Sequence, residues 1–151
     1  MSSVFLSHKY SWLSFEEMDL YLSPIKQALE WMWYKVFCSL YMEEWFQKQW
    51  WNVDYIYERC CEQQASYDIT LGIIRSSQDS YGMQLELDCA QNNNKPYLLL
   101  IQTNALEYER VSKYIERADA HSAFKNVSDL NLELLWSLVD VGNRKLATVN
   151  L

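Results

Sequence analysis

Two short apolar runs in the second half of the chain most constrain how it can fold. Residues 68–74 read DITLGII and residues 97–101 read YLLLI, and neither run alternates apolar with polar positions. A strand that is apolar on both sides is typical of a parallel sheet whose two faces are covered by helices. These runs therefore predict an α/β architecture.

Three weaker segments complete the predicted sheet. Apolar and β-branched residues predict strands at residues 4–6, 34–39 and 123–127. Capping residues and 3–4 spacing predict helices over residues 14–22, 24–33, 55–65, 80–93, 105–118 and 129–139. This alternation favours a five-stranded parallel sheet in the order 2-1-3-4-5, which is a flavodoxin-like three-layer sandwich. The 151 residues are expected to form a single domain.

One helix boundary in this prediction depends on proline. Ser14 and Glu17 have the spacing of a capping box and open a first helix. Ser23-Pro24 resembles a second N-cap followed by a first helical residue, so we expect a new helix to begin there.

Composition and charge exclude several classes of protein. Half of the residues are hydrophobic and only 3 Gly and 2 Pro are present, which excludes disordered and fibrous classes. A net charge of −7 argues against nucleic acid or an anionic membrane as the main partner. No apolar run approaches the roughly 18 residues of a membrane span, and the opening MSSVFLSHKY lacks the features of a signal peptide. We therefore expect a cytoplasmic protein.

The four cysteines are expected to be free thiols. Cys38, Cys60, Cys61 and Cys89 show no CxxC spacing, and two of them are adjacent. This pattern predicts neither a zinc site nor disulfides. No metal and no cofactor are expected.

Glu86 lies in an unusual position on its predicted helix. At 100° per residue, Gln84, Asp88 and Gln91 share a polar face, whereas Glu86 stands in an arc of apolar and small residues. A carboxylate turned toward a core costs several kcal/mol unless it is paired. Two interpretations remain open: a buried structural glutamate, or a catalytic carboxylate in a dry cleft, where burial raises its pKa.

The predicted topology places Glu86 near the expected ligand site. In an open parallel sheet, ligands bind beyond the carboxyl ends of the strands where the strand order reverses, here between the first and third strands. The polar stretches 7–11 and 75–82 follow those strands. We expect the site at this edge.

The stretch YDITLGIIRSSQDSYGMQLELDCAQNNNKPYLLLI resembles the nucleoside 2-deoxyribosyltransferases and the related 2′-deoxynucleoside 5′-monophosphate N-glycosidases. The matching positions are Asp68, Ser80, Gly82, Glu86-Leu87, Ala90 and Lys95-Pro96. The specific part of the resemblance covers about 20 residues, although the opening VFLSH and the segment 108–127 also fit in order and length. The resemblance implies a nucleoside or nucleotide substrate, N-glycosidic chemistry and a homo-oligomer.

The resemblance also implies roles for individual residues. Glu86 falls on the nucleophile, which attacks the anomeric carbon of a deoxyribose to form a glycosyl-enzyme. Ser80 falls where the monophosphate glycosidases hold the 5′-phosphate, although a plain N-cap is an equal alternative. The predicted substrate-binding residues are Ser7, His8, Ser80, Gly82 and Met83. Asp68 is expected to be structural, because it begins its strand at the far end from the site.

One position departs from the family pattern. An aspartate that places or protonates the base usually lies eight residues before Asp68, and here that position is Cys60. A thiol is a poor substitute for a carboxylic acid as proton donor. Glu58 and Glu62 lie on other faces of the helix. Either Tyr10 or His8 replaces the aspartate as proton donor, or the activity has changed or been lost. Tyr10 is predicted to be catalytic together with Glu86.

Two other functions remain open. VFLSH is also similar to the first strand of TIR-like domains, whose NAD-cleaving members carry a glutamate in the corresponding helix. The Trp-Cys pair often found before that glutamate is absent here. The third possibility is a non-catalytic interaction module that uses an aromatic segment as its partner surface. Its residues are Tyr41, Trp45, Phe46, Trp50, Trp51 and Tyr55.

Overall fold

The structure is a computed structural model that describes residues 2–8, 15–38, 53–75, 81–126, 128, 130 and 132–149. Five strands form one parallel sheet in the order β2-β1-β3-β4-β5, which confirms the predicted strand order. They are β1 (Ser3–His8), β2 (Lys35–Cys38), β3 (Ile69–Ile74), β4 (Tyr97–Gln102) and β5 (Ala120–Phe124).

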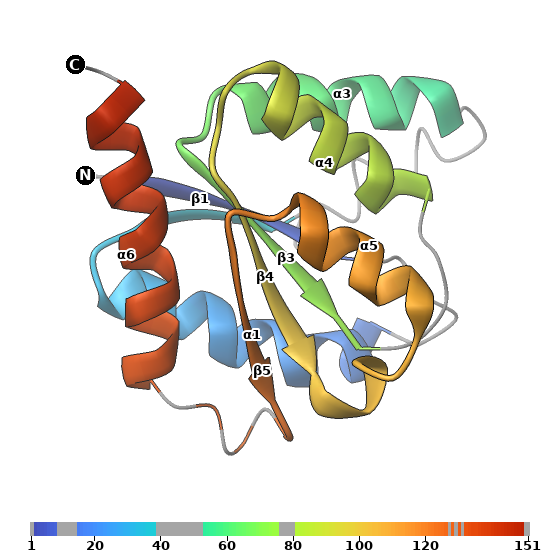
Figure 1. The fold of residues 1–151 in the computed structure, drawn as a ribbon, viewed down its shortest axis with the longest axis vertical. Helices are drawn as coiled ribbons and strands as arrows, with labels where there is room; N and C mark the ends of the chain where they lie inside the picture. The colour runs from blue at the N-terminus through green and yellow to red at the C-terminus, as the bar shows by residue number, and fades with distance from the viewer. Residues whose placement is uncertain are drawn as a thin grey trace.

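Helices cover both faces of this sheet and make a three-layer α/β fold (Figure 1). One face packs against α1 (Phe15–Trp31) and α6 (Leu132–Val149), and the other packs against the remaining helices. Those helices are α3 (Val53–Ala65), α4 (Tyr81–Asn92) and α5 (Glu109–Arg117), with a short 3-10 helix, η2 (Thr103–Ala105), after β4.

Strand alternation assigns each buried residue to one of the two faces. Val4 and Leu6 of β1 belong to the core cluster under α1 and α6, whereas Phe5 packs against Cys60 of α3. Successive side chains of a strand point to opposite faces, so Ser7 lies on the α3 side and His8 on the α1 side. Both residues are buried and are the last two of β1. The prediction that they belong to a polar loop is therefore wrong.

The predicted helix break at Ser23-Pro24 is also wrong. Helix α1 runs without interruption from Phe15 to Trp31 and contains Pro24. Leu22, Ile25 and Leu29 are fully buried by this helix. Pro24 and the residue four before it, Leu20, are both exposed. The carbonyl that proline cannot bond therefore lies on the solvent side, where water can satisfy it, and burial of the apolar face outweighs the loss.

Three boundaries in the last third of the chain differ from the prediction. The polar helix expected over 105–118 begins only at Glu109, after η2. Strand β5 begins at Ala120, three residues early, because backbone pairing with β4 extends over its polar residues. Helix α6 continues ten residues beyond the predicted end at Val139. It passes Gly142, which packs so closely on Ile69 that a Cβ there would lie 3.1 Å from Ile69 Cδ1. Tertiary packing has overridden the low helix propensity of glycine.

Asp68 connects the amino ends of two neighbouring strands. Its carboxylate accepts hydrogen bonds from the backbone N–H of Ser3 at 3.0 Å and from Ser3 Oγ at 3.1 Å. This edge is opposite to the carboxyl ends of β1 and β3. The contacts agree with the structural role predicted for Asp68.

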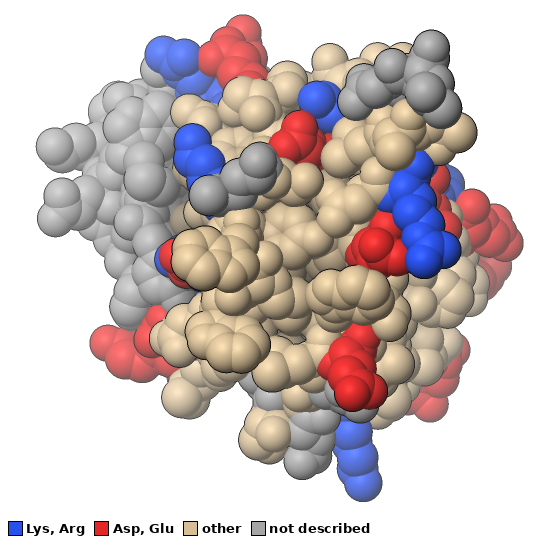
Figure 2. Space-filling model, turned by 90° about the vertical axis from the view of Figure 1, so that its left-hand side faces the viewer, with Lys and Arg blue, Asp and Glu red and all other residues tan. Residues whose placement is uncertain are grey.

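An exposed aromatic groove of about 450 Å³ lies between the end of α1 and the start of α6. Trp31 is 80% exposed and Trp136 is 55% exposed there. Figure 2 faces the α6 side of the molecule, where uncharged side chains fill the centre and charged ones lie around them. The groove is lined by Trp31, Met32, Leu132, Glu133, Trp136 and Ser137. The aromatic residues proposed as a partner surface at positions 41–55 lie outside the described side chains.

Candidate active site

Glu86 is directed toward the interior from the middle of α4, as predicted. Helix α4 is held on the sheet by Met83, Leu87 and Ala90, which are all buried. Glu86 is half-buried, and its carboxylate accepts a hydrogen bond from the hydroxyl of Ser7, which is fully buried at the end of β1. Burial raises the pKa of Glu86 to about 8, although the Ser7 hydrogen bond acts in the opposite direction. A carboxylate of this kind is a candidate functional group.

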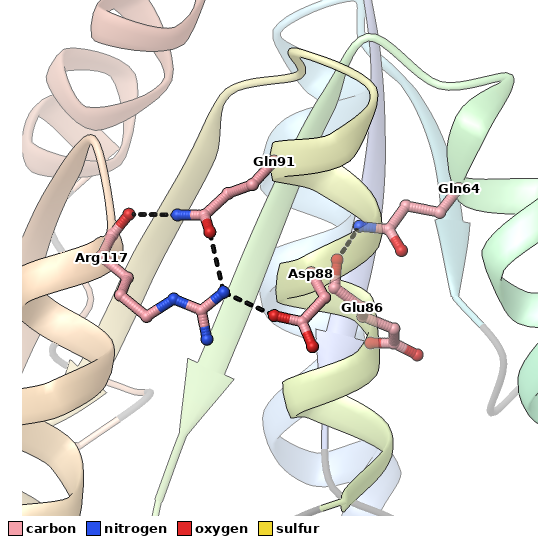
Figure 3. Close-up of polar contacts among 5 residues, drawn as sticks. All are labelled: Gln64, Glu86, Asp88, Gln91 and Arg117. Carbon is pink, nitrogen blue, oxygen red and sulfur yellow. Dashed lines mark hydrogen bonds and ion pairs between the residues drawn. The ribbon is translucent and has the colours of Figure 1, made fainter.

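Helix α3 fixes the backbone of α4 at the same residue. Gln64 Nε2 donates to the backbone carbonyl oxygen of Glu86 at 2.5 Å (Figure 3). The same nitrogen donates to Thr70 Oγ1 of β3 at 2.9 Å. Gln64 and Thr70 are both buried. The amide therefore connects α3, α4 and the central strand behind the carboxylate. The sequence analysis missed Gln64; its only signal was a polar residue on the side of the helix that also carries Cys60.

Cys60 lies beside Glu86, at the position where the family pattern has an aspartate. The residue is 8% exposed and packs against Phe5. Burial first, and the charge of Glu86 second, raise the pKa of Cys60 to about 12. The thiol therefore stays neutral at physiological pH and is a poor proton donor. Glu58 and Glu62 are exposed whereas Cys60 is buried, which agrees with the prediction that they lie on other faces of the helix.

The second carboxylate on α4 has a different environment. Arg117 of α5 contacts Asp88 Oδ1 at 2.5 Å and Gln91 Oε1 at 2.7 Å through Nη2. In Figure 3 the Asp88 side chain points toward Arg117, and the Glu86 side chain points away from it. Asp88 and Arg117 are both exposed. Arg117 is thus paired with the outer carboxylate, Asp88, whereas the inner carboxylate, Glu86, accepts a hydrogen bond from the Ser7 hydroxyl.

The structure brings together only some of the predicted site residues. Ser7 meets Glu86 directly. Gly82 is half-buried in the first turn of α4, and Met83 packs into the core cluster beside Leu87. His8 alternates to the opposite side of the sheet, so β1 separates it from Glu86. Tyr10 and Ser80 lie outside the described residues.

Arg75 follows β3 at the carboxyl edge of the sheet. Its guanidinium lies 4.1 Å from the centre of the Tyr21 ring, on the α1 side. Arg75 Nε is buried and has no hydrogen-bond partner among the described residues. This cation is therefore held by an aromatic ring at the switch point of the strand order, and on the other side of the sheet from Glu86.

The cysteine prediction requires a correction. Cys61 of α3 and Cys89 of α4 form a disulfide, with their Cα atoms 6.0 Å apart, whereas Cys38 and Cys60 are buried and form no disulfide. The two partners are 28 residues apart, and only the packing of α3 against α4 brings them together. Spacing along the chain could not reveal this pairing.

The described residues contain neither a ready-made metal centre nor a helix of membrane-spanning character. No group of three or more His, Cys, Asp or Glu side chains in the described part of the chain is arranged to hold a metal ion. None of the helices described there has the length and hydropathy to cross a membrane.

The chain matches known proteins in structure, but no match was found by sequence. No protein-family model and no curated protein matches the chain. The structure of the CMP N-glycosidase BcmB of Clostridium botulinum matches with a TM-score of 0.60 and 14% identity, covering 89% of this chain and 97% of that one. A 2-deoxyribosyltransferase of Bacillus psychrosaccharolyticus matches with a TM-score of 0.60 and 20% identity, covering 85% and 89%. The chain therefore shares the three-layer α/β fold of these two enzymes.

Proposed function

We propose that this protein cleaves or transfers the N-glycosidic bond of a 2′-deoxynucleoside or its 5′-monophosphate, with Glu86 as nucleophile. The observation that supports it most is the Glu86 carboxylate, which is turned inward from α4 and hydrogen-bonded by the buried Ser7 hydroxyl. The resemblance around Glu86 and the fold shared with an N-glycosidase and a deoxyribosyltransferase support the same chemistry.

The proposed first step is attack by a Glu86 carboxylate oxygen on the anomeric carbon of the deoxyribose. The carbon–oxygen bond forms as the bond from that carbon to the base nitrogen breaks, through an oxocarbenium-like transition state. The base leaves with the bonding electron pair and takes up a proton. Water then hydrolyses the glycosyl-enzyme, or a second base displaces Glu86.

The leaving base needs a proton donor other than Cys60. The Cys60 thiol has a pKa of about 12, so it holds its proton too tightly to protonate a departing base efficiently. We assign this role to Tyr10, which follows β1 in the sequence. His8, the other donor considered, lies on the opposite side of the sheet from Glu86.

The phosphate and the sugar are proposed to bind around the start of α4. Ser80 immediately precedes that helix, where free backbone N–H groups suit an anion, and Gly82 lies in its first turn. We also propose that the chain works as a homo-oligomer, as the resemblance implies. We propose a cytoplasmic location from the sequence, in which no apolar run is of membrane length. Sedimentation analysis of the purified protein tests the assembly.

The direct test is release of free base from a panel of 2′-deoxynucleosides and their 5′-monophosphates, followed by chromatography. We expect slow release by the wild-type protein and loss of at least about 10³-fold in Glu86→Ala. Asp88→Ala is the matched control, since it removes the exposed carboxylate of the same helix. Its rate should stay near that of the wild type.

Mass spectrometry of the protein during turnover should detect a glycosyl adduct on Glu86. Equal turnover by Glu86→Ala and the wild type would remove Glu86 from the mechanism. Release of nicotinamide from NAD, with no base released from any deoxynucleotide, would replace the proposal with the TIR-like function.

A further inference from the structure

Tyr97, the first residue of β4, carries a buried hydroxyl that makes no hydrogen bond of regular geometry with the described residues. The residue is 0% exposed and belongs to the core cluster under α4 and α5. A buried tyrosine hydroxyl ordinarily finds a partner, because leaving it unpaired costs free energy. Its position therefore needs an explanation.

A glycine provides the space for this hydroxyl. Gly72 lies in the middle of β3, and a Cβ added there would lie only 2.7 Å from Tyr97 Oη. In the sheet, Tyr97 is paired with Thr70, so the phenol extends along β3 by two residues to reach Gly72. Gly72 is in turn paired with Ser7 of β1. The missing side chain lets the phenol cross the central strand toward Ser7.

Glu86 and Ser7 both affect the pKa of the Tyr97 hydroxyl. Burial raises the pKa of Tyr97, the charge of Glu86 raises it further, and the hydroxyl of Ser7 lowers it. Tyr97 is consequently protonated at all physiological pH values and can always donate. A serine hydroxyl has one proton to donate and two lone pairs to accept with. Ser7 uses its proton on Glu86, which leaves its oxygen available to accept.

We infer that Tyr97 is a positioning residue for Glu86: its hydroxyl donates to Ser7 Oγ, and Ser7 donates in turn to the carboxylate. The hydrogen-bond chain orients the carboxylate and stabilises its ionised form, because each bond polarises the next. The inference rests on the proposed function for its catalytic meaning. Tyr97 is fully buried, so it acts on substrate only through Glu86.

Among the residues that the structure describes, the other titratable groups that act on this chain of hydrogen bonds are Cys60, Tyr114 and Arg117. Cys60 faces Glu86 from α3 as a neutral thiol. From α5, Tyr114 raises and Arg117 lowers the pKa of Tyr97. Arg117 is paired with Asp88 on the outer side of α4. Replacing Tyr97 by phenylalanine leaves all of these groups in place, so any change reports the hydroxyl.

The test is a direct titration of the Glu86 carboxyl by NMR, in protein with ¹³C-labelled glutamate and no substrate. Glu86→Gln identifies the signal. In Tyr97→Phe the midpoint should rise by about half a pH unit, and in Ser7→Ala by about one. In the double variant it should rise no further than in Ser7→Ala, because the tyrosine acts only through the serine.

Matched variants separate this role from packing. Gly72→Ala crowds the phenol and should raise the midpoint as Tyr97→Phe does. Gly142→Ala crowds Ile69 on the other face of the sheet and should leave it unchanged. Tyr21→Phe, which removes a buried hydroxyl on that other face, should also leave it unchanged.

Two outcomes would overturn the inference. The first is a Glu86 midpoint in folded Tyr97→Phe that equals that of the wild type. The second is a shift in the double variant that equals the sum of the two single-variant shifts. The titration requires no turnover, so its result is independent of the proposed reaction. Activity retained by Glu86→Ala would overturn the reaction and leave the hydrogen-bond chain standing.

Discussion

The two faces of the sheet differ in how many buried polar groups they carry. Under α1 and α6 the sheet contributes a mainly apolar surface, with the buried His8 at the carboxyl end of β1. Its apolar residues are Val4, Leu6, Ile69, Leu71, Ile73, Leu98 and Leu100. Under α3, α4 and α5 the corresponding surface is broken by Ser7, Thr70 and Gly72, and Gln64 and Glu86 meet it from the helices. One face is mainly apolar and favours stability, whereas the other holds buried polar groups, which cost free energy unless they are paired.

Energetics explains why the polar face needs a reason to exist. A buried polar group costs free energy unless it is hydrogen-bonded. Gln64 Oε1 and the Tyr97 hydroxyl are buried on this face and make no hydrogen bond of regular geometry with the described residues. Such costs are typical of functional sites and uncommon in a purely structural core.

The largest effect on stability is expected on the apolar face. Leu71 is fully buried at the centre of the sheet. Leu71→Ala should lower the free energy of unfolding by about 2–5 kcal/mol through lost burial and a residual cavity. Denaturant unfolding measures the loss. If Leu71→Ala also shifts the midpoint of the Glu86 titration, the two faces of the sheet are not independent.

A smaller effect, with a definite pH dependence, is expected at Glu86. Its pKa is raised from 4.5 to about 8 in the folded protein, so between these values the folded state holds a proton that the unfolded state has lost. Stability should therefore fall by a few kcal/mol as pH rises from 5 to 9. Glu86→Gln should remove most of this decline in unfolding experiments across that range. An unchanged slope in the variant would mean that the carboxyl is solvated.

The smallest effect is expected on the outer side of the same helix. Asp88 forms an exposed ion pair with Arg117. Asp88→Ala should change the free energy of unfolding by at most about 1 kcal/mol, and less at high salt. Thermal unfolding at two salt concentrations measures it. A larger loss of unfolding free energy would show that the Asp88–Arg117 ion pair between α4 and α5 contributes to stability beyond burial.

Local patterns in the chain were enough to predict the sheet and the direction of Glu86. The apolar runs at β3 and β4 indicated parallel strands, and the arc around Glu86 indicated a carboxylate facing inward; both are confirmed. The same patterns failed where packing competes with a local signal. Pro24 and Gly142 lie inside α1 and α6 because the apolar faces of these helices are buried along their whole length.

The partners of Glu86 were decided by tertiary structure alone. Ser7 was expected at this edge of the sheet, but its hydrogen bond to Glu86 was not. Gln64, Gly72 and Tyr97 come from three further elements and share no spacing or motif in the sequence. The Cys61–Cys89 disulfide depends likewise on how α3 lies against α4. Secondary structure and the inward orientation of Glu86 depend on residues close to one another in the sequence, so the periodicity of apolar residues is enough to predict them. Contacts across the sheet depend on strand register and helix placement, which are set only when the whole core packs.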